Sequence, residues 1–303
     1  MASAPATVRI AGSSSVRRRL RRDRRVWIGV GVLAAMALIA LFAPLIAPYD
    51  PAAQLDISRL HNQPPSFAHP LGTDTFSRDV LSRMIYGARV SLTISLVAVA
   101  IATAFGTLVG VIAGYVGGAI DAILMRLVDA AFSIPTLLLL IVVIALWGEI
   151  GVIFLTLLIS GVAWFAISRL VRAETLAVRD ADYVVAARAL GIPSWRILAR
   201  HVLPNVVGPA IVAATLAIGN VILLEAGLSY LGIGVRPPTA SWGSIIQEGS
   251  ERVSDLWWLT LFPGLAILVT VFACNALGDA LRDALDPRQL LASLGDETVH
   301  ETR

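Results

Sequence analysis

The chain contains 303 residues, of which 57% are hydrophobic and 15% are charged, and its mean hydropathy is +0.78. This composition excludes a soluble domain, because a chain of this length could not bury so much apolar surface, and it indicates an integral membrane protein. All 24 basic residues are arginines, since the sequence contains no lysine. The missing lysine excludes a P-loop and a Schiff-base enzyme, so another polypeptide must bind any ATP that drives the activity.

The N-terminal tail, residues 1-25, holds eight arginines and includes the run "RRRLRRDRR" at 17-25. A nucleic-acid site would interleave aromatic residues with the basic ones, which this run does not do. The run lies directly before an apolar span, which favours a role in membrane topology and contact with anionic membrane lipid. We therefore expect no nucleic-acid partner.

Six apolar runs are long enough to cross a hydrocarbon core of about 30 Å as helices. The runs are continuous rather than alternating, which favours helices over barrel strands. We therefore predict an all-α integral membrane protein with six transmembrane helices and both termini on one side. The spans are approximately 26-48, 90-116, 127-147, 150-168, 206-231 and 256-278.

The distribution of arginine predicts the orientation of these spans. Eighteen arginines fall in the two tails and in the loops on the same side, against six on the other side. The positive-inside rule therefore places both termini in the cytoplasm.

Two external loops of unequal size follow from this topology, at 49-89 and 232-255. The first contains many proline and glycine turn signals, and its residues 79-89 have the spacing of a short helix that leads into the second span. In the second loop, Pro237 and Pro238 break the helix, and Trp242 suits a position near the lipid headgroups or at a docking surface.

The second span carries Gly106, Gly110 and Gly114, whose spacing of four places them on one side of a helix. Such a face lets another helix approach closely, either within the subunit, which we favour, or at a dimer interface. The next segment is "GGAIDAILMRLVDAAFSIP". Its pattern predicts an amphipathic helix along the inner membrane surface, and the true third span follows Pro135. The start of a snorkelling span would explain the same pattern.

The segment "ADYVVAARALGIPSWRILARHVLPN", residues 181-205, is too polar to be another span. The pattern predicts a helix from Glu174 to Leu190, Gly191 at its C′ position with a positive φ, and Pro193 opening the next turn. The resulting hairpin either docks a partner protein through its alanines and apolar residues, or folds back on the chain's own helix ends.

The stretch from Ala186 to Asn205 resembles the EAA loop of ABC importer permeases, whose pattern is E-A-A, three residues, Gly, nine residues, I-x-L-P. Val185 stands where the glutamate would be, and His201 where the isoleucine would be. Both departures resemble the dipeptide and oligopeptide (peptide/nickel) branch, in which "DYVxAARALG" and "HxLPN" are usual. Similar segments extend from about residue 69 to 288, and the extra first span resembles the C-type subunit.

The resemblance implies the type I importer permease core, formed by five helices over 90-278 with a coupling loop at 173-204, and a cytoplasmic tail at 279-303. It also implies a multi-pass protein of a prokaryotic plasma membrane that forms a heterodimer with a B-type permease subunit. Two ATPase subunits would carry ATP and Mg²⁺, an extracytoplasmic solute-binding protein would deliver peptides, and this chain would bind no cofactor. The ATPase-coupling residues that it implies are Ala186, Ala187, Arg188, Ala189, Leu190, Gly191, Ile192, Pro193, Ser194, Trp195, His201, Leu203 and Pro204.

Three polar residues within the spans are candidates for the translocation pathway or a gate: Asn220, Glu225 and Asn275. An acidic group at membrane depth is costly unless it is solvated or paired, so Glu225 indicates helix packing or an outer gate more than substrate contact. We expect no catalytic residue and no metal site, since the four histidines are scattered and Cys274 is alone. A proton-coupled secondary transporter and a non-transporting membrane scaffold remain alternative functions.

Overall fold

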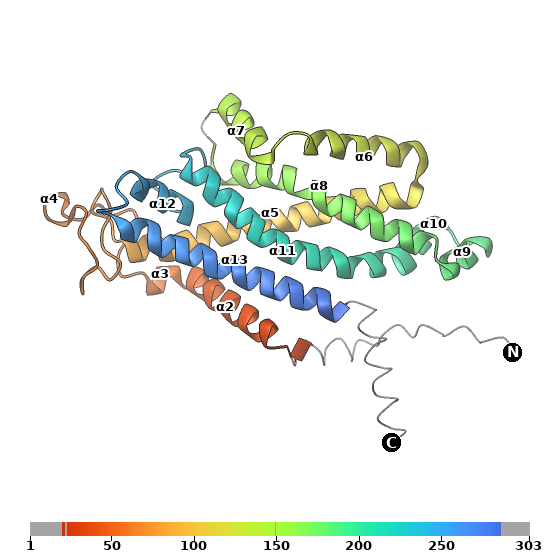
Figure 1. The fold of residues 1–303 in the computed structure, drawn as a ribbon, viewed down its shortest axis with the longest axis horizontal. Helices are drawn as coiled ribbons and strands as arrows, with labels where there is room; N and C mark the ends of the chain where they lie inside the picture. Colours follow the sequence, from red (N-terminus) through yellow and green to blue (C-terminus); the bar gives the residue numbers. More distant parts are fainter. Residues whose placement is uncertain (1–19, 22, 149, 286–303) are drawn as a thin grey trace, which may run out of the picture.

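The computed structural model describes residues 20–21, 23–148 and 150–285. Within this part of the chain nearly all regular structure is helical, and the only β-bridge joins Thr73 to Asp79. The predicted all-α fold is therefore confirmed. Most of the two predicted tails, 1-25 and 279-303, lies outside the described residues. The long helices are α2 (Arg24–Leu41), α5 (Val80–Val116), α8 (Val152–Arg179), α11 (Leu203–Tyr230) and α13 (Trp257–Leu285), and they run along the long axis of the molecule in Figure 1.

Shorter helices connect and flank these long ones. The N-terminal side contributes α3 (Ala43–Ile46) and α4 (Ile57–Leu60), and the middle of the chain contributes α6 (Gly118–Phe132) and α7 (Thr136–Trp147). Four further elements complete the described part: α9 (Asp182–Ala189), α10 (Ser194–Ile197), the π turn η1 (Leu198–Val202) and α12 (Trp242–Ser250).

Five helices are long and apolar enough to cross a membrane, and the sixth span requires α6 and α7 to be taken together, with a bend of 84° between them. The prediction of one regular helix over 127-147 was therefore wrong. Pro135 explains the break, because a proline lacks the backbone N–H and disfavours helical geometry in the residue before it.

Helix α6 lies along α8 and not across the ends of the long helices, which corrects the expected surface helix (Figure 1). Its contacts follow an antiparallel order: Phe132 lies near Phe165, Asp129 lies 3.8 Å from Arg169, and Asp121 binds Arg172. The charged face of this amphipathic helix is thus paired with arginines of α8.

Helix α5 starts earlier and α8 ends later than the apolar runs indicated. Asp79 caps α5 by accepting a hydrogen bond from the Ser82 backbone N–H at 2.8 Å. The predicted external loop 49-89 therefore overlaps the first ten residues of α5. Helix α8 continues past residue 168 to Arg179, and the expected single helix from Glu174 to Leu190 is interrupted between α8 and α9.

The first helix, α2, is joined to the last one, α13, near the N-terminal end of α2. Arg25 forms an ion pair of 2.7 Å with Asp283, and Gly29 packs against Ala273 and Leu277. Asp23 caps α2, and the Arg25 guanidinium holds the pKa of its carboxyl below the usual value. The first span therefore belongs to the same helical body as the rest.

The glycine face of α5 packs against α8 of the same chain, which confirms tight packing within the subunit. A Cβ atom at Gly106, Gly110 or Gly114 would lie 2.6–2.8 Å from backbone or side-chain atoms of α8. At Gly110 the nearest atom is the Ser168 carbonyl oxygen. Because that atom is backbone, the two helices could admit a side chain only by moving apart.

Replacing Gly110 with valine is expected to lower the stability of the folded protein by about 3 kcal/mol, because overpacking forces α5 away from α8. Gly161→Val is the matched control, since Gly161 lies in α8 and no atom of the described residues lies within 4 Å of where its Cβ would be. Thermal unfolding of the detergent-solubilised protein measures both. Equal melting temperatures for the two variants would contradict the packing assigned to α5 and α8.

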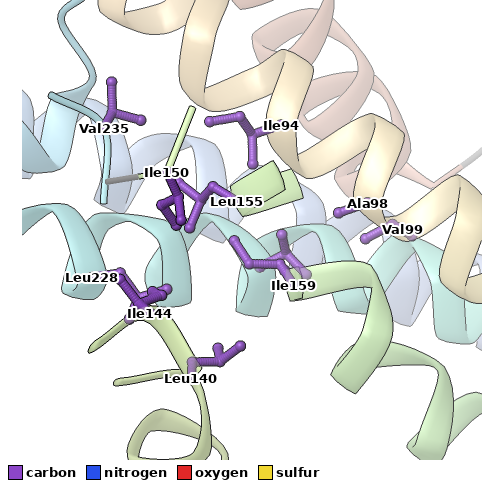
Figure 2. Close-up of a cluster of buried hydrophobic side chains, with 11 residues drawn as sticks. Ile94, Ala98, Val99, Leu140, Ile144, Ile150, Leu155, Ile159, Leu228 and Val235 are labelled. Carbon is purple, nitrogen blue, oxygen red and sulfur yellow. The ribbon is translucent and has the colours of Figure 1, made fainter. Parts of the chain in front are cut away.

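An apolar cluster joins α7 to the main bundle. Figure 2 shows Leu140 and Ile144 of α7 near Leu155 and Ile159 of α8 and near Leu228 of α11. These are the only two buried side chains of α7. Lipid is as apolar as these side chains, so close packing rather than exclusion from water holds α7 in place.

The helix ends on the side of α4 and α12 are held together by a buried ionic network (Figure 1). Arg78 and Arg83 each bind both Asp74 and Glu248, with Arg78 Nε 2.7 Å from Asp74 and Arg83 Nη2 2.7 Å from Glu248. Glu248 belongs to α12, so the network joins α5 to the two loops that were predicted to be external. Trp242, at the start of α12, is only 1% exposed, which corrects its expected position at the headgroups or a docking surface.

Replacing Arg83 with methionine is expected to destabilise the fold by about 3–5 kcal/mol, because two buried carboxylates lose a partner. The control is Arg59→Met, whose side chain is 86% exposed in a loose pair with Asp56 and should leave the melting temperature unchanged. A melting temperature of Arg83→Met equal to that of the control would show that the network adds nothing to stability.

Candidate functional site

The candidate site is the segment between α8 and α11, residues 180–202, which we call the elbow. It consists of α9, a tight turn, α10 and η1. Figure 1 shows α9 and α10 at the end of the bundle opposite to α4 and α12. Of the predicted coupling residues, all but Leu203 and Pro204, which open α11, lie in this elbow.

The turn of the elbow ends α9 by hydrogen bonding its last carbonyl groups. Gly191 has a φ of +75°, as the sequence predicted. Its N–H donates to the Arg188 carbonyl at 3.0 Å, and the Ile192 N–H donates to the Ala187 carbonyl at 3.2 Å. These two bonds form a Schellman motif, in which a residue with positive φ closes the helix. Pro193 then caps α10.

One face of the elbow packs on the chain's own helices. Val184, Ala187 and Ile197 are buried in a cluster with residues of α5, α8 and α11, among them Val111 and Val171. Ala187 is only 6% exposed, so the expectation that it faces a partner protein was wrong. The alternative of a hairpin folded back on its own helix ends therefore holds for this face.

The opposite face of the elbow is exposed and apolar. Leu190 is 81% exposed, Trp195 is 66% exposed, and Val185 is 51% exposed. Ala186 and Ala189 are also exposed beside them. Large apolar side chains gathered at one exposed turn mark a surface for a partner.

The elbow returns to the bundle through η1, which ends directly before α11. The Leu203 N–H bonds to the Leu198 carbonyl, five residues back, which is the pattern of a π turn. Such π turns often occur at functional sites. Asn205 donates to the His201 carbonyl and, at 3.4 Å, to the Tyr183 hydroxyl. Asn205 at the start of α11 therefore contacts both α9 and η1 of the elbow, a role that the sequence reasoning did not give it.

Arg179 was also missed. It is the last residue of α8, and its Nη1 donates to the Gly114 carbonyl of α5 at 3.0 Å. No local sequence signal could have shown this contact, since the two residues are 65 positions apart.

The three polar candidates of the spans lie in two different environments. Glu225 is fully buried and accepts hydrogen bonds from Ser91 of α5 at 3.0 Å and from Ser229 at 2.7 Å. Asn220 and Asn275 are exposed instead, where α11 and α13 approach each other near Gly219. Glu225 therefore joins helices within the subunit, whereas the two asparagines lie exposed at its surface.

Residues 106–290 match the family model described as binding-protein-dependent transport system inner membrane component. Residues 13–65 match the N-terminal TM domain of oligopeptide transport permease C. The chain is 45% identical over 275 residues to the dipeptide transport system permease protein DppC of Escherichia coli strain K12, covering 88% of this chain and 90% of the relative. It is 42% identical over 272 residues to a putative peptide transport system permease protein of Brucella abortus, covering 89% and 90%.

The chain belongs to this family of binding-protein-dependent inner membrane permeases. The larger match covers the elbow and every helix from α6 to α13, and the N-terminal match covers α2, α3 and α4. The permease is thus a multi-pass inner membrane protein with the additional first span of the C-type subunit.

The part of this permease that the structure describes contains no group of three or more metal-ligating side chains placed to hold a metal ion. As a permease it is a transport component, and the geometry of its elbow fits contact with another protein.

Proposed function

We propose that this permease forms half of the translocation pathway of an ATP-driven importer for dipeptides, oligopeptides or related solutes. The exposed apolar face of the elbow, formed by Val185, Leu190 and Trp195, carries the proposal. The relatives named as dipeptide and peptide permeases supply the substrate class. Both termini and the elbow lie in the cytoplasm in this arrangement, because the arginines concentrate on that side.

The elbow couples the permease to ATP hydrolysis on two partner ATPase subunits. Leu190 and Trp195 stand at the exposed turn and serve as anchors in a groove of an ATPase. The permease has no lysine for a nucleotide-binding P-loop, so ATP and Mg²⁺ are held by those partners. Closure of the ATPases moves the elbow only if the contacts differ between their open and closed states.

The buried face of the elbow determines which helices such a movement reaches. Its side chains share one cluster with α5, α8 and α11, and no residue of α2 or α13 belongs to that cluster. Displacement of the elbow is therefore passed to the inner ends of these three helices. Helices α2 and α13 act as a support, since Arg25 and Asp283 tie them to each other.

Asn220 and Asn275 mark the face that lines the pathway or meets the B-type permease subunit. Both side chains are exposed within spans and make no hydrogen bond with the described residues. An amide facing hydrocarbon without a partner is costly, so this face turns towards water or towards polar groups of the second subunit.

Asn220→Leu and Asn275→Leu are expected to reduce peptide uptake about tenfold each without lowering the melting temperature, because each change removes an amide from the pathway face. Asn220→Gln is the matched control and retains an amide at the same position. Uptake by the assembled transporter in membrane vesicles measures all three. Full uptake by both leucine variants would remove this face from the pathway.

Reconstitution of the transporter tests the proposed function. The permease would be purified with its second permease subunit and ATPases, placed in vesicles with the solute-binding protein, and given a mixture of radiolabelled dipeptides. We expect accumulation that requires ATP and all the subunits. Uptake by this chain alone in a proton gradient would show a secondary transporter, and absence of any uptake or ATPase association would favour a scaffold.

A further inference from the structure

The corner between α5 and α6 lies beside the elbow and consists of two glycines with positive φ. Gly117 has a φ of +71° and Gly118 a φ of +59°. Such conformations favour glycine, and two in succession allow the chain to reverse direction within a few residues. The last carbonyl groups of α5 at this corner need hydrogen-bond partners from outside the helix.

Arg179 supplies one of these partners from the end of α8. Its Nη1 lies 3.0 Å from the Gly114 carbonyl oxygen, and its Nε lies 3.2 Å from the Asp180 carboxylate. A cation here also complements the negative end of the α5 dipole. A Cβ at Gly117 would lie 3.0 Å from the same Nη1, so the glycine leaves the room that Arg179 occupies.

Two more arginines of α8 and α9 contact the residues around this corner. The Arg188 guanidinium lies 5.6 Å from the centre of the Tyr115 ring. Arg172 forms a bidentate ion pair with Asp121 of α6, with one contact of 2.6 Å. Both sides of the glycine corner are therefore held by side chains from α8 and the elbow.

The position of Arg179 is distinct from that of the other two arginines. Asp180 and Ala181 follow it and belong to no helix, so the chain can pivot there between α8 and α9. Arg179 thus stands at the pivot of the elbow and holds the end of a helix that is remote in the sequence.

We propose that Arg179 is a positioning residue that transmits displacement of the elbow to the inner end of α5 and to the α5–α6 corner. The inference rests on the proposed coupling function, and it adds a specific linkage between the elbow and the bent span α6–α7. Without this linkage the elbow would move against α5 without carrying the corner with it. ATP would then be hydrolysed with little transport.

The test compares ATP hydrolysis with uptake of the radiolabelled dipeptide mixture in vesicles that contain the full transporter. In Arg179→Met we expect uptake to fall about tenfold while ATP hydrolysis stays within about twofold of wild type, so that more ATP is consumed per peptide. Arg179→Lys should recover most of the coupling, because an ammonium group can still donate to the Gly114 carbonyl. Arg282→Met is the control, since Arg282 lies in α13 outside the elbow, is exposed, and makes no hydrogen bond or ion pair with the described residues.

An unchanged ratio of ATP to peptide in Arg179→Met would overturn the inference, as would a parallel loss of uptake and hydrolysis, which indicates a structural role alone. If Arg179→Met does not assemble, Arg179→Gln takes its place, because glutamine is uncharged and shorter than arginine. A ratio of ATP to peptide equal to that of wild type in Arg179→Gln would then overturn the linkage. A wild-type transporter without ATP-dependent uptake contradicts the proposed function itself, and this result is seen before any variant is compared.

Discussion

Gly191→Val is expected to abolish ATP-dependent uptake and weaken association with the ATPases, while membrane insertion remains intact. Gly191 holds a φ of +75°, which a β-branched residue adopts at a cost of about 1–3 kcal/mol. No described residue lies within 4 Å of where its Cβ would be, so the effect cannot come from a clash within the part of the chain that the structure describes. The loss would come from opening the turn that presents Leu190 and Trp195. Uptake assays and co-purification with the ATPases measure it.

Gly191→Asn is the matched control for this turn. Asparagine tolerates positive φ better than other residues with side chains, so the Schellman bonds to Arg188 and Ala187 should persist. We expect this variant to retain most of the uptake. Normal uptake by Gly191→Val would reject the coupling role of the elbow, whereas loss in both variants would point to crowding by the partner at this position.

Glu225→Ala is expected to destabilise the permease strongly, because the buried hydroxyl groups of Ser91 and Ser229 both lose their acceptor. Each unsatisfied buried group costs about 1–3 kcal/mol, and a cavity adds to this loss. Ser91 also accepts a hydrogen bond at 3.4 Å from the backbone N–H of Trp242, the first residue of α12, so α12 should loosen as well. Thermal unfolding and protease sensitivity of the external loop 232-255 measure the effect.

Glu225→Gln separates a structural role from a role in gating. The glutamine keeps one carbonyl acceptor and nearly the same shape, so we expect a melting temperature close to that of wild type and normal peptide uptake. A large loss of uptake in a stable Glu225→Gln protein would show that the acidic group itself acts in the transport cycle. The structural assignment would then fail.

Much of the elbow could be predicted from its sequence. The positive φ of Gly191 follows from its place after the apolar stripe of a helix and before Ile192 and Pro193. The glycine spacing of α5 likewise predicted a close helix contact, and the structure assigns that contact to α8. These signals are local, because a turn or a helix face is specified by residues that are one to four positions apart.

Other features could not be predicted, since they depend on which helices become neighbours. The burial of Ala187 requires α5 and α8 beneath α9, and alanine fits an exposed surface equally well in the sequence. The bend at Pro135 was visible only as a span boundary, because its angle depends on the packing of α6 along α8. The extension of α8 to Arg179 was missed, since its polar end no longer resembles a span.

The sequence by itself determined that this protein crosses the membrane repeatedly, carries no nucleotide-binding lysine and forms a tight glycine turn between two polar helix ends. Composition and short-range spacing are sufficient for these conclusions, because each follows from the residue types or from contacts within a few positions. The tertiary structure alone decided which face of the elbow is free, what satisfies Glu225 and what Arg179 holds. Ser91 lies 134 positions from Glu225 and Gly114 lies 65 positions from Arg179, and only the packing of whole helices brings these pairs together.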